Sequence, residues 1–129
     1  MPRYLTPEWL EAAHEAVAHN AHLTEAAKKI DVTVQHVVTG GPDGDALYHI
    51  VIEDGSVSVL PGEAHDATIT FVQDWETATA IGRGDLSAQG AFMTGRIRVR
   101  GDLSKLVDFG NVFGAVNDVF ADLRARTTY

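Results

Sequence analysis

Two histidines have the widest range of possible chemistry in this chain, because they lie in neighbouring segments that read as strands. If the turn between these segments is centred near Pro42 and Asp43, His36 and His49 face each other across the pair. Two imidazoles can begin a metal site or supply a general base. A metal needs further ligands, however, and no carboxylate is placed to supply them. We therefore expect a cross-strand polar pair and no metal.

Three other histidines lie near the end of an early helix. His14, His19 and His22 are separated by five and three residues, so they do not all share one helical face. We expect them to lie on the solvated surface.

A run of arginines is the main basic feature. Arg96, Arg98 and Arg100 alternate with Ile97 and Val99. The simplest interpretation is a half-buried strand with a solvated basic face. The alternative is contact with an anionic headgroup, a membrane surface or an acidic partner. This alternative gains weight because residues 83–129 carry seven basic and five acidic groups, whereas residues 1–82 carry three basic and thirteen acidic groups.

The motifs of catalysis and phosphate binding are missing. Residues 82–87 (GRGDLS) begin like a dinucleotide-binding loop, but they lack the third glycine and follow a helix where that loop must follow a strand. They are better explained as the end of a helix. The chain contains no Gly-x-Ser-x-Gly nucleophile motif. We expect neither catalytic nor cofactor-binding residues.

The C-terminal region has a strong apolar periodicity. Its spacing of four, three, four and three residues predicts an amphipathic helix with Phe109, Phe113, Val116, Phe120 and Leu123 on one face. Val112 and Val119 widen this stripe, and the expected opposite face consists of Asp108, Asn111, Ala115, Asp118 and Asp122. The stripe either packs in the core or roofs a cavity for an apolar ligand.

The elements that must position these residues are an early helix, five strands and later helices. Thr6, Pro7 and Glu8 predict a helix start, because threonine caps free amides and proline suits the first turn. The other expected elements are a short helix over 24–29, strands over 32–39, 46–53, 56–60, 67–72 and 96–100, a helix from 75 capped by Asp74, a helix over 86–93 capped by Asp85, and a helical region from 101 to about 126. This order predicts an α+β fold.

The strongest turn signal is Asp54-Gly55, which favours a two-residue hairpin. It sets Glu53 opposite Ser56, Ile52 opposite Val57 and Ile50 opposite Val59. The four apolar residues then share a face, which we expect to be the core face.

Length and composition exclude several classes of protein. The 129 residues suit one domain spanning 1–129, and the net charge of -8 argues against a nucleic-acid partner. The absence of cysteine excludes disulfides, thiolate zinc sites and cysteine nucleophiles. No apolar run approaches the ~20 residues that cross a bilayer, and the N-terminal residues lack the apolar h-region of a signal peptide, so we expect a cytoplasmic protein.

Residues 84–103 (GDLSAQGAFMTGRIRVRGDL) resemble the signature of the sterol carrier protein type 2 (sterol-binding) domain family. The resemblance is supported upstream by residues 48–55 and 66–70, and it extends over about 25–125. It implies an α+β domain with a five-stranded mixed, largely antiparallel sheet, covered by helices and enclosing an apolar tunnel. Members bind fatty acids, fatty acyl-CoA, sterols or phospholipids, and the domain itself has no catalytic group.

The resemblance also implies which residues bind lipid. Gln89, Phe92 and Met93 would lie on a helix bordering the tunnel, Ile97 and Val99 on the adjoining strand, and the terminal helix over the mouth. The full expected set is Leu86, Gln89, Phe92, Met93, Ile97, Val99, Leu106, Phe109, Phe113, Val116 and Phe120, with Arg96, Arg98 and Arg100 as headgroup or membrane contacts. The ending Thr127-Thr128-Tyr129 differs from a Ser-Lys-Leu peroxisomal address, so we do not expect that location.

Three functions follow as hypotheses. The first is a protein that holds or transfers a lipid, with at most transient membrane contact. The second is an accessory or protein-interaction domain without a ligand. The third, less favoured, is a small enzyme for an apolar substrate in which His36 or His49 pairs with a carboxylate as general base.

Overall fold

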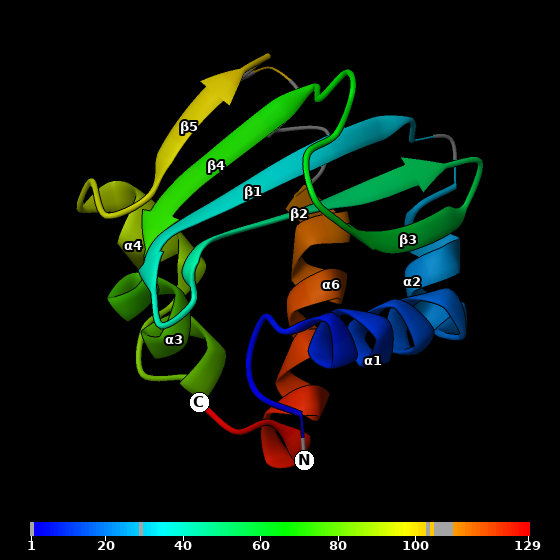
Figure 1. Cartoon of the computed structure of the whole chain (residues 1–129). Coiled ribbons are helices and arrows are strands. Elements are labelled where there is room, and N and C mark those ends of the chain that lie inside the picture. Colours follow the sequence, from blue (N-terminus) through cyan, green and yellow to red (C-terminus); the bar gives the residue numbers. More distant parts are fainter. Residues whose placement is uncertain (1, 29, 103, 105–109) are drawn as a thin grey trace.

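The computed structural model consists of a five-stranded sheet with helices packed against one of its faces (Figure 1). It describes residues 2–28, 30–102, 104 and 110–129. The elements in chain order are α1 (Pro7–Ala18), α2 (Ala21–Ala26), β1 (Val32–Gly41), β2 (Gly44–Glu53), β3 (Ser56–Pro61), β4 (Ile69–Asp74), α3 (Trp75–Arg83), α4 (Ala88–Met93), β5 (Arg98–Gly101), α6 (Gly110–Leu123) and the short 3₁₀ helix η1 (Arg124–Arg126).

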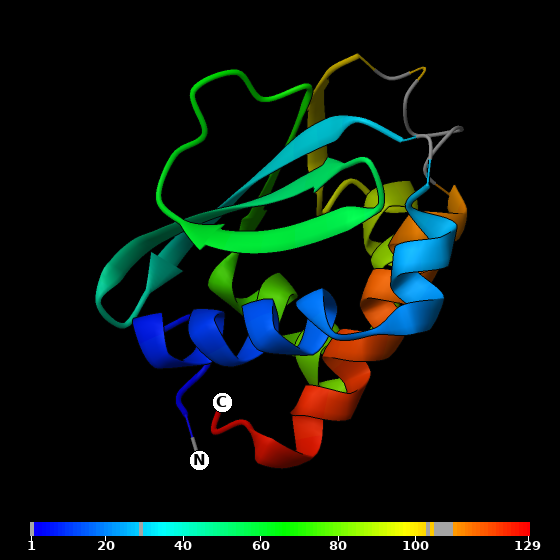
Figure 2. The ribbon, with the colours of Figure 1, turned by 90° about the vertical axis from the view of Figure 1, so that its right-hand side faces the viewer.

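The strand order in the sheet is β3-β2-β1-β4-β5. β1 and β4 are parallel, and the other three pairs are antiparallel, which confirms the mixed, largely antiparallel sheet. In Figure 2 the helices lie below the sheet, and the loop from β3 to β4 lies above it. We call the helix-covered face the inner face and the opposite face the outer face.

The β3–β4 loop is held to the outer face by one buried side chain. The Gln35 amide nitrogen donates to the carbonyls of Tyr48 and Gly62, and its amide oxygen accepts from the Ala64 N–H. Gln35 is only 4% exposed because this loop covers it.

The β2–β3 hairpin is as expected. Asp54 and Gly55 both have positive φ, at 49° and 83°, as a two-residue turn of this type requires. The predicted pairs are confirmed, with Glu53 opposite Ser56. The four apolar residues predicted to share the core face, Ile50, Ile52, Val57 and Val59, are buried on the inner face.

The β1–β2 turn corrects the expected histidine pair. The register shifts between Val38 and Gly41, where Gly40 has a φ of 71°. This bulge inserts one residue into β1, so His36 pairs with Tyr48, and His49 pairs with Gln35. Since a shift of one residue reverses the face, His36 lies on the inner face and His49 on the outer face.

The helix starts follow their caps. Thr6 caps α1 and Asp74 caps α3 as expected, the latter by accepting the Thr77 N–H at 2.7 Å. The expected helix over 86–93 begins later, because Ser87 and not Asp85 accepts the first free amide, from Gly90 at 3.0 Å. The Asp85 N–H instead donates to the Ala80 carbonyl at the end of α3.

Other boundaries shift by a few residues. The helix expected over 24–29 is α2 over Ala21–Ala26, because Asn20 caps it by accepting the Leu23 N–H at 2.9 Å. β4 and β5 each begin and end later than expected. The described part of the terminal helical region is α6 followed by η1.

The buried face of α6 is wider than predicted. Val112, Val116, Val119 and Leu123 are buried as expected, and Phe120 is partly buried. Ala115 is only 5% exposed, although the periodicity placed it on the polar face. α6 contacts α1, α2 and α3, so more than one side of the helix is covered.

α1 packs against β3, and this contact partly buries one histidine of α1. His14 is partly buried, and its Nδ1 accepts the N–H of Val59 at 3.1 Å. It satisfies a backbone group of an edge strand, so the expectation of a solvated His14 is wrong. His19 is exposed beside Glu15, and His22 is exposed, as expected.

The two ends of the chain meet below the sheet. Arg3 forms a parallel bridge with Thr128, and the buried Trp9 Nε1 donates to the Thr127 Oγ1 at 3.0 Å. The ring of Tyr4 contacts those of Trp9, Trp75 and Tyr129. No helix of the described ranges is long and apolar enough to span a bilayer.

Candidate functional site

The helices cover the inner face unevenly. Seven side chains from β1 to β3, which we call the closed patch, are at most 4% exposed: Val32, Val34, Val38, Ile50, Ile52, Val57 and Val59. Four inner-face side chains nearer β5, which we call the open patch, are partly exposed: His36, Phe71, Gln73 and Val99.

The open patch crosses three strands. The register aligns Tyr48, His36, Phe71 and Val99 in one row, and Gln73 lies two residues beyond Phe71 on the same face. Phe71 and Val99 pack against the buried core. The open patch is therefore continuous with the core, yet the helical layer leaves it incompletely covered.

The imidazole of His36 is held by its two neighbours in the row. Its ring is parallel to the Tyr48 ring, with a centroid distance of 4.6 Å and an interplanar angle of 2°, and it lies 5.4 Å from the Phe71 ring. The residue as a whole is partly exposed, but solvent reaches neither ring nitrogen, and neither has a hydrogen-bond partner in the structure as described. Burial lowers the pKa of His36 to about 4, so the ring is neutral at neutral pH.

Gln73 contributes a second unpaired polar atom. Its side-chain oxygen is buried without a hydrogen-bond partner in the described ranges. β4 pairs with β1 so that Gln73 lies opposite Val38, which places it diagonally from His36. The open patch thus combines apolar rings with two unpaired polar groups.

Charged side chains are absent from the inner-face positions of the described strands. Burial also raises the pKa of Tyr48 well above its ordinary range, which keeps the phenol neutral. His36 has no carboxylate partner among the described residues, and these include no cluster of three metal-binding side chains. The open patch can bind a neutral or apolar group, and none of its own residues is a histidine paired with a carboxylate in the structure as described.

The predicted lipid-binding residues divide into buried and exposed sets. Val116 belongs to the buried core cluster, and Ile97 is 8% exposed. Val99 and Phe120 are partly buried and pack against that cluster, with the Phe120 ring 5.6 Å from that of Trp9. On α4, Ala91 is fully buried, but Phe92 and Met93 are 48% and 75% exposed. Gln89 is also exposed, and Leu86 is partly buried.

The remaining predicted residues lie beyond this description. Leu106 and Phe109 are outside the described residues, and so is the side chain of Phe113. The roles assigned to all these residues in lipid binding stay predictions.

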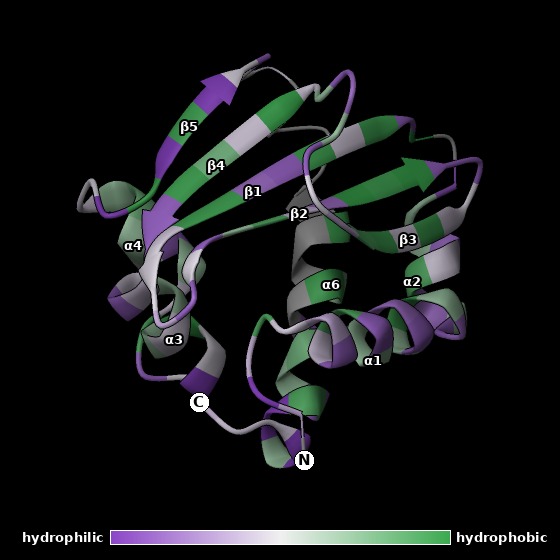
Figure 3. Ribbon diagram, viewed as in Figure 1, coloured by the Kyte–Doolittle hydropathy of each residue, from purple (hydrophilic) through white to green (hydrophobic). Residues whose placement is uncertain are grey.

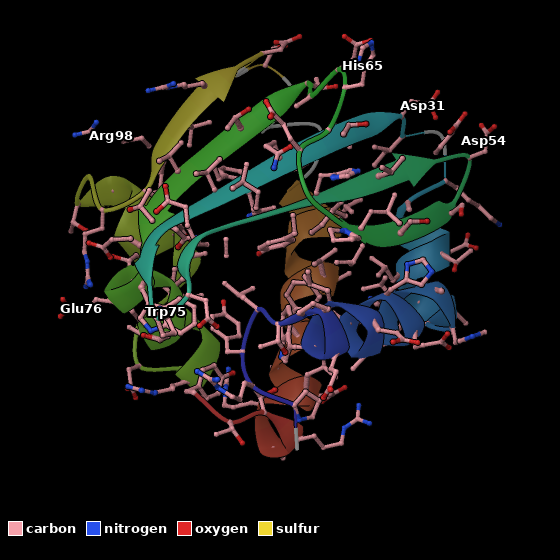
Figure 4. The ribbon with its side chains drawn as sticks, in the orientation of Figure 1. Asp31, Asp54, His65, Trp75, Glu76 and Arg98 are labelled. Carbon is pink, nitrogen blue, oxygen red and sulfur yellow. The ribbon has the colours of Figure 1, made fainter. Side chains whose placement is uncertain are left out.

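Two of the three arginines lie on the outer side of β5, and Arg96 precedes that strand. Arg98 and Arg100 are exposed, on the face opposite Val99, and Figure 4 shows Arg98 pointing away from the sheet. Polar and apolar residues alternate along this strand in Figure 3. Arg96 Nε donates to the Thr77 Oγ1 at 3.2 Å, which ties the segment before β5 to α3.

Sequence reasoning missed Tyr48, Phe71 and Gln73 as possible site residues. It identified His36 but assigned it the wrong partner. The bulge at Gly40 could have been suspected from the two glycines at 40 and 41, and the corrected register would have placed Tyr48 beside His36.

Comparison with known proteins identifies the fold and the family. The model of the SCP-2 sterol transfer family matches residues 10–114. The crystal structure of sterol carrier protein 2 has a TM-score of 0.78 at 17% identity, covering 92% of this chain and 98% of that chain.

Two further structures have the same fold. A conserved hypothetical protein from Thermus thermophilus has a TM-score of 0.77 at 17% identity, covering 95% of this chain and 91% of that chain. The ubiquinone synthesis protein UbiJ-SCP2 has a TM-score of 0.59 at 20% identity, covering 93% and 95%. No curated protein matches. Because the family match extends over most of its length, this chain belongs to the SCP-2 sterol transfer family.

Proposed function

We propose that this chain holds one long apolar lipid against the inner face of the sheet and carries it unchanged. Family membership indicates lipid binding or transfer. The observation that supports a ligand in this chain is the open patch, where aromatic and aliphatic side chains of the core face stay partly exposed. The ligand classes proposed are a fatty acid, a fatty acyl-CoA and a sterol-like molecule.

The energetics of burial suit such a ligand. Each methylene group transferred from water contributes about 0.8 kcal/mol, and part of this is offset by the cost of ordering the ligand. Micromolar affinity is therefore within reach of a chain of about sixteen carbons.

We also propose a transient membrane contact at α4 and β5. The side chains of Phe92 and Met93 are exposed near the start of the arginine-rich segment, where Arg98 and Arg100 are exposed too. Apolar side chains beside basic ones suit the interface of an anionic membrane. The net charge of -8 keeps the attraction local and the contact brief.

The proposal is tested by displacement of a fluorescent fatty acid from the purified protein, with native mass spectrometry to identify bound lipid. We expect saturable micromolar binding and recovery of the lipid unchanged. Val99→Asn should weaken binding, whereas Val72→Asn, the same replacement on the outer face of the neighbouring strand β4, should not. No saturable binding by the wild type would instead favour an accessory domain without a ligand, and a chemically altered lipid would favour an enzyme.

A further inference from the structure

The two unpaired polar groups of the open patch are unusual for a protein interior. Nearly all buried polar atoms find a hydrogen-bond partner, because an unmet one loses its bonds to water without replacement. Both nitrogens of His36 and the side-chain oxygen of Gln73 lack a partner in the structure as described. An apolar residue at either position would avoid the cost of an unpaired buried polar atom. The presence of two polar residues there suggests that a ligand group supplies the missing hydrogen bonds.

The two side chains are placed to reach one such group. β1 and β4 are adjacent and parallel, and His36 and Gln73 lie on the same inner face two residues apart in register. The spacing of neighbouring strands and the rise per residue put their Cα atoms about 8 Å apart. Side chains of this length can both reach a single small group between them.

The orientation of the imidazole is fixed by stacking. Tyr48 covers one face of the ring at 4.6 Å, and Phe71 lies beside it at 5.4 Å. The ring nitrogens form hydrogen bonds in the plane of the ring, and both are unpaired in the structure as described.

The available hydrogen bonds select a neutral partner. Because burial holds the pKa of His36 near 4, the neutral ring offers one N–H donor and one acceptor. Tyr48 on β2 and Tyr4, whose pKa values burial raises, also stay neutral. With no charged side chain on the described inner face, a carboxylate would be desolvated without a counter-charge. A hydroxyl group both donates and accepts, so it can bond His36 and either end of the Gln73 amide.

We infer that His36 and Gln73 form an interior polar site that receives the hydroxyl group of the bound lipid. This inference rests on the proposed function and refines it, because it favours an apolar alcohol of the sterol or long-chain type over an ionised fatty acid. The apolar remainder of the ligand lies along Phe71 and Val99 in the open patch.

The test compares three ligands with the same twelve-carbon chain: 1-dodecanol, dodecanoate and dodecane. Each is titrated into the full-length protein at pH 7.5 and measured by displacement of a fluorescent fatty acid. We expect 1-dodecanol to bind at least about tenfold more tightly than dodecanoate or dodecane, as for a site built to bond a hydroxyl. His36→Phe and Gln73→Leu should each remove most of this preference and leave dodecane binding in place.

A matched control is available on the neighbouring strand. His49→Phe makes the same replacement on the outer face, where His49 Nδ1 lies 3.1 Å from the Gly62 carbonyl oxygen. It should leave the preference unchanged. A second readout that needs no variant is the ring nitrogen chemical shifts of His36, which 1-dodecanol should move and dodecane should not.

The outcomes separate this inference from the proposed function. If the wild type binds none of the three ligands and no fluorescent probe, the proposed function fails. If it binds them without preferring the alcohol, or prefers dodecanoate, only the interior polar site is overturned. Retention of the preference in both His36→Phe and Gln73→Leu overturns the interior polar site as well.

Discussion

The closed and open patches belong to one sheet face but differ in what the helices do to them. In the closed patch, residues such as Val34 and Ile50 are almost completely buried beneath the helical layer. In the open patch, Phe71 and Val99 sit in the same sheet yet stay partly exposed. Burial of apolar area stabilises the fold in the closed patch, whereas part of the apolar area of the open patch stays exposed. Under the proposed function a ligand covers this exposed part, so stability and binding would be divided between two regions of one sheet face.

The largest expected effect concerns His36, the polar member of the open patch on β1. Its pKa is about 4 in the folded protein and about 6.5 when unfolded, so the unfolded chain binds more protons between these values. Stability present above pH 6.5 is therefore lost as the pH falls toward 4, by about 3 kcal/mol. Urea unfolding of the wild type and His36→Phe across this range measures the effect.

The free energy of unfolding is plotted against pH for the wild type and for His36→Phe. The difference between these two curves isolates the contribution of His36, because carboxylates that titrate below pH 5 contribute to both. The neighbouring titratable group, Tyr48, stays protonated throughout this range. Parallel curves for the two proteins would show that the ring is solvated in the folded state.

A second prediction compares the two patches by making the same valine-to-alanine replacement in each. Val34→Ala in the closed patch should lower the free energy of unfolding by about 2 kcal/mol, because it removes buried methyl groups and leaves a cavity. Val99→Ala in the open patch should cost less than about 1 kcal/mol, because Val99 is already partly exposed. Chemical denaturation measures both. Equal losses would mean that the two patches are packed alike.

The smallest effect concerns α3, which follows β4 directly. Asp74→Ala removes the carboxylate that accepts the Thr77 N–H and should cost about 1 kcal/mol, whereas Asp74→Asn should retain most of the cap. The bonds from Thr77 lower the pKa of Asp74, so its contribution is present at neutral pH and is lost as the pH falls through that lowered value.

Hydrogen exchange would localise the change in Asp74→Ala. Faster exchange in α3 and the adjoining β4, with β2 and β3 unaffected, is the expected pattern. Uniform acceleration across the sheet would show that the two patches unfold as a single unit.

Local chemistry made much of the fold predictable. The Asp54-Gly55 turn carries positive φ angles that few residue pairs accept, so the register of β2 and β3 followed from two residues. Thr6 and Asp74 capped helices as predicted because their side chains reach amides within one turn. Ser87 was overlooked because it and Asp85 are both good capping residues two positions apart.

Contacts between distant segments were less predictable. Periodicity placed Ala115 on a polar face, but α6 contacts three helices and Ala115 is buried. Periodicity also gave no reason for His14 to be partly buried. The hydrogen bond that His14 accepts comes from the N–H of Val59, which is 45 residues away on β3.

The sequence by itself determined an α+β fold, the β2–β3 register, the caps of α1 and α3 and the family, because each depends on short-range residue chemistry or on an uninterrupted motif. Only the tertiary structure decided that His36 stacks on Tyr48 with both nitrogens buried, and that Gln73 lies diagonally across from it. The physical reason is the extra residue at the Gly40 bulge. It turns His36 to the helix-covered face while His49 stays on the outer face, and its effect depends on how the strands pair in space.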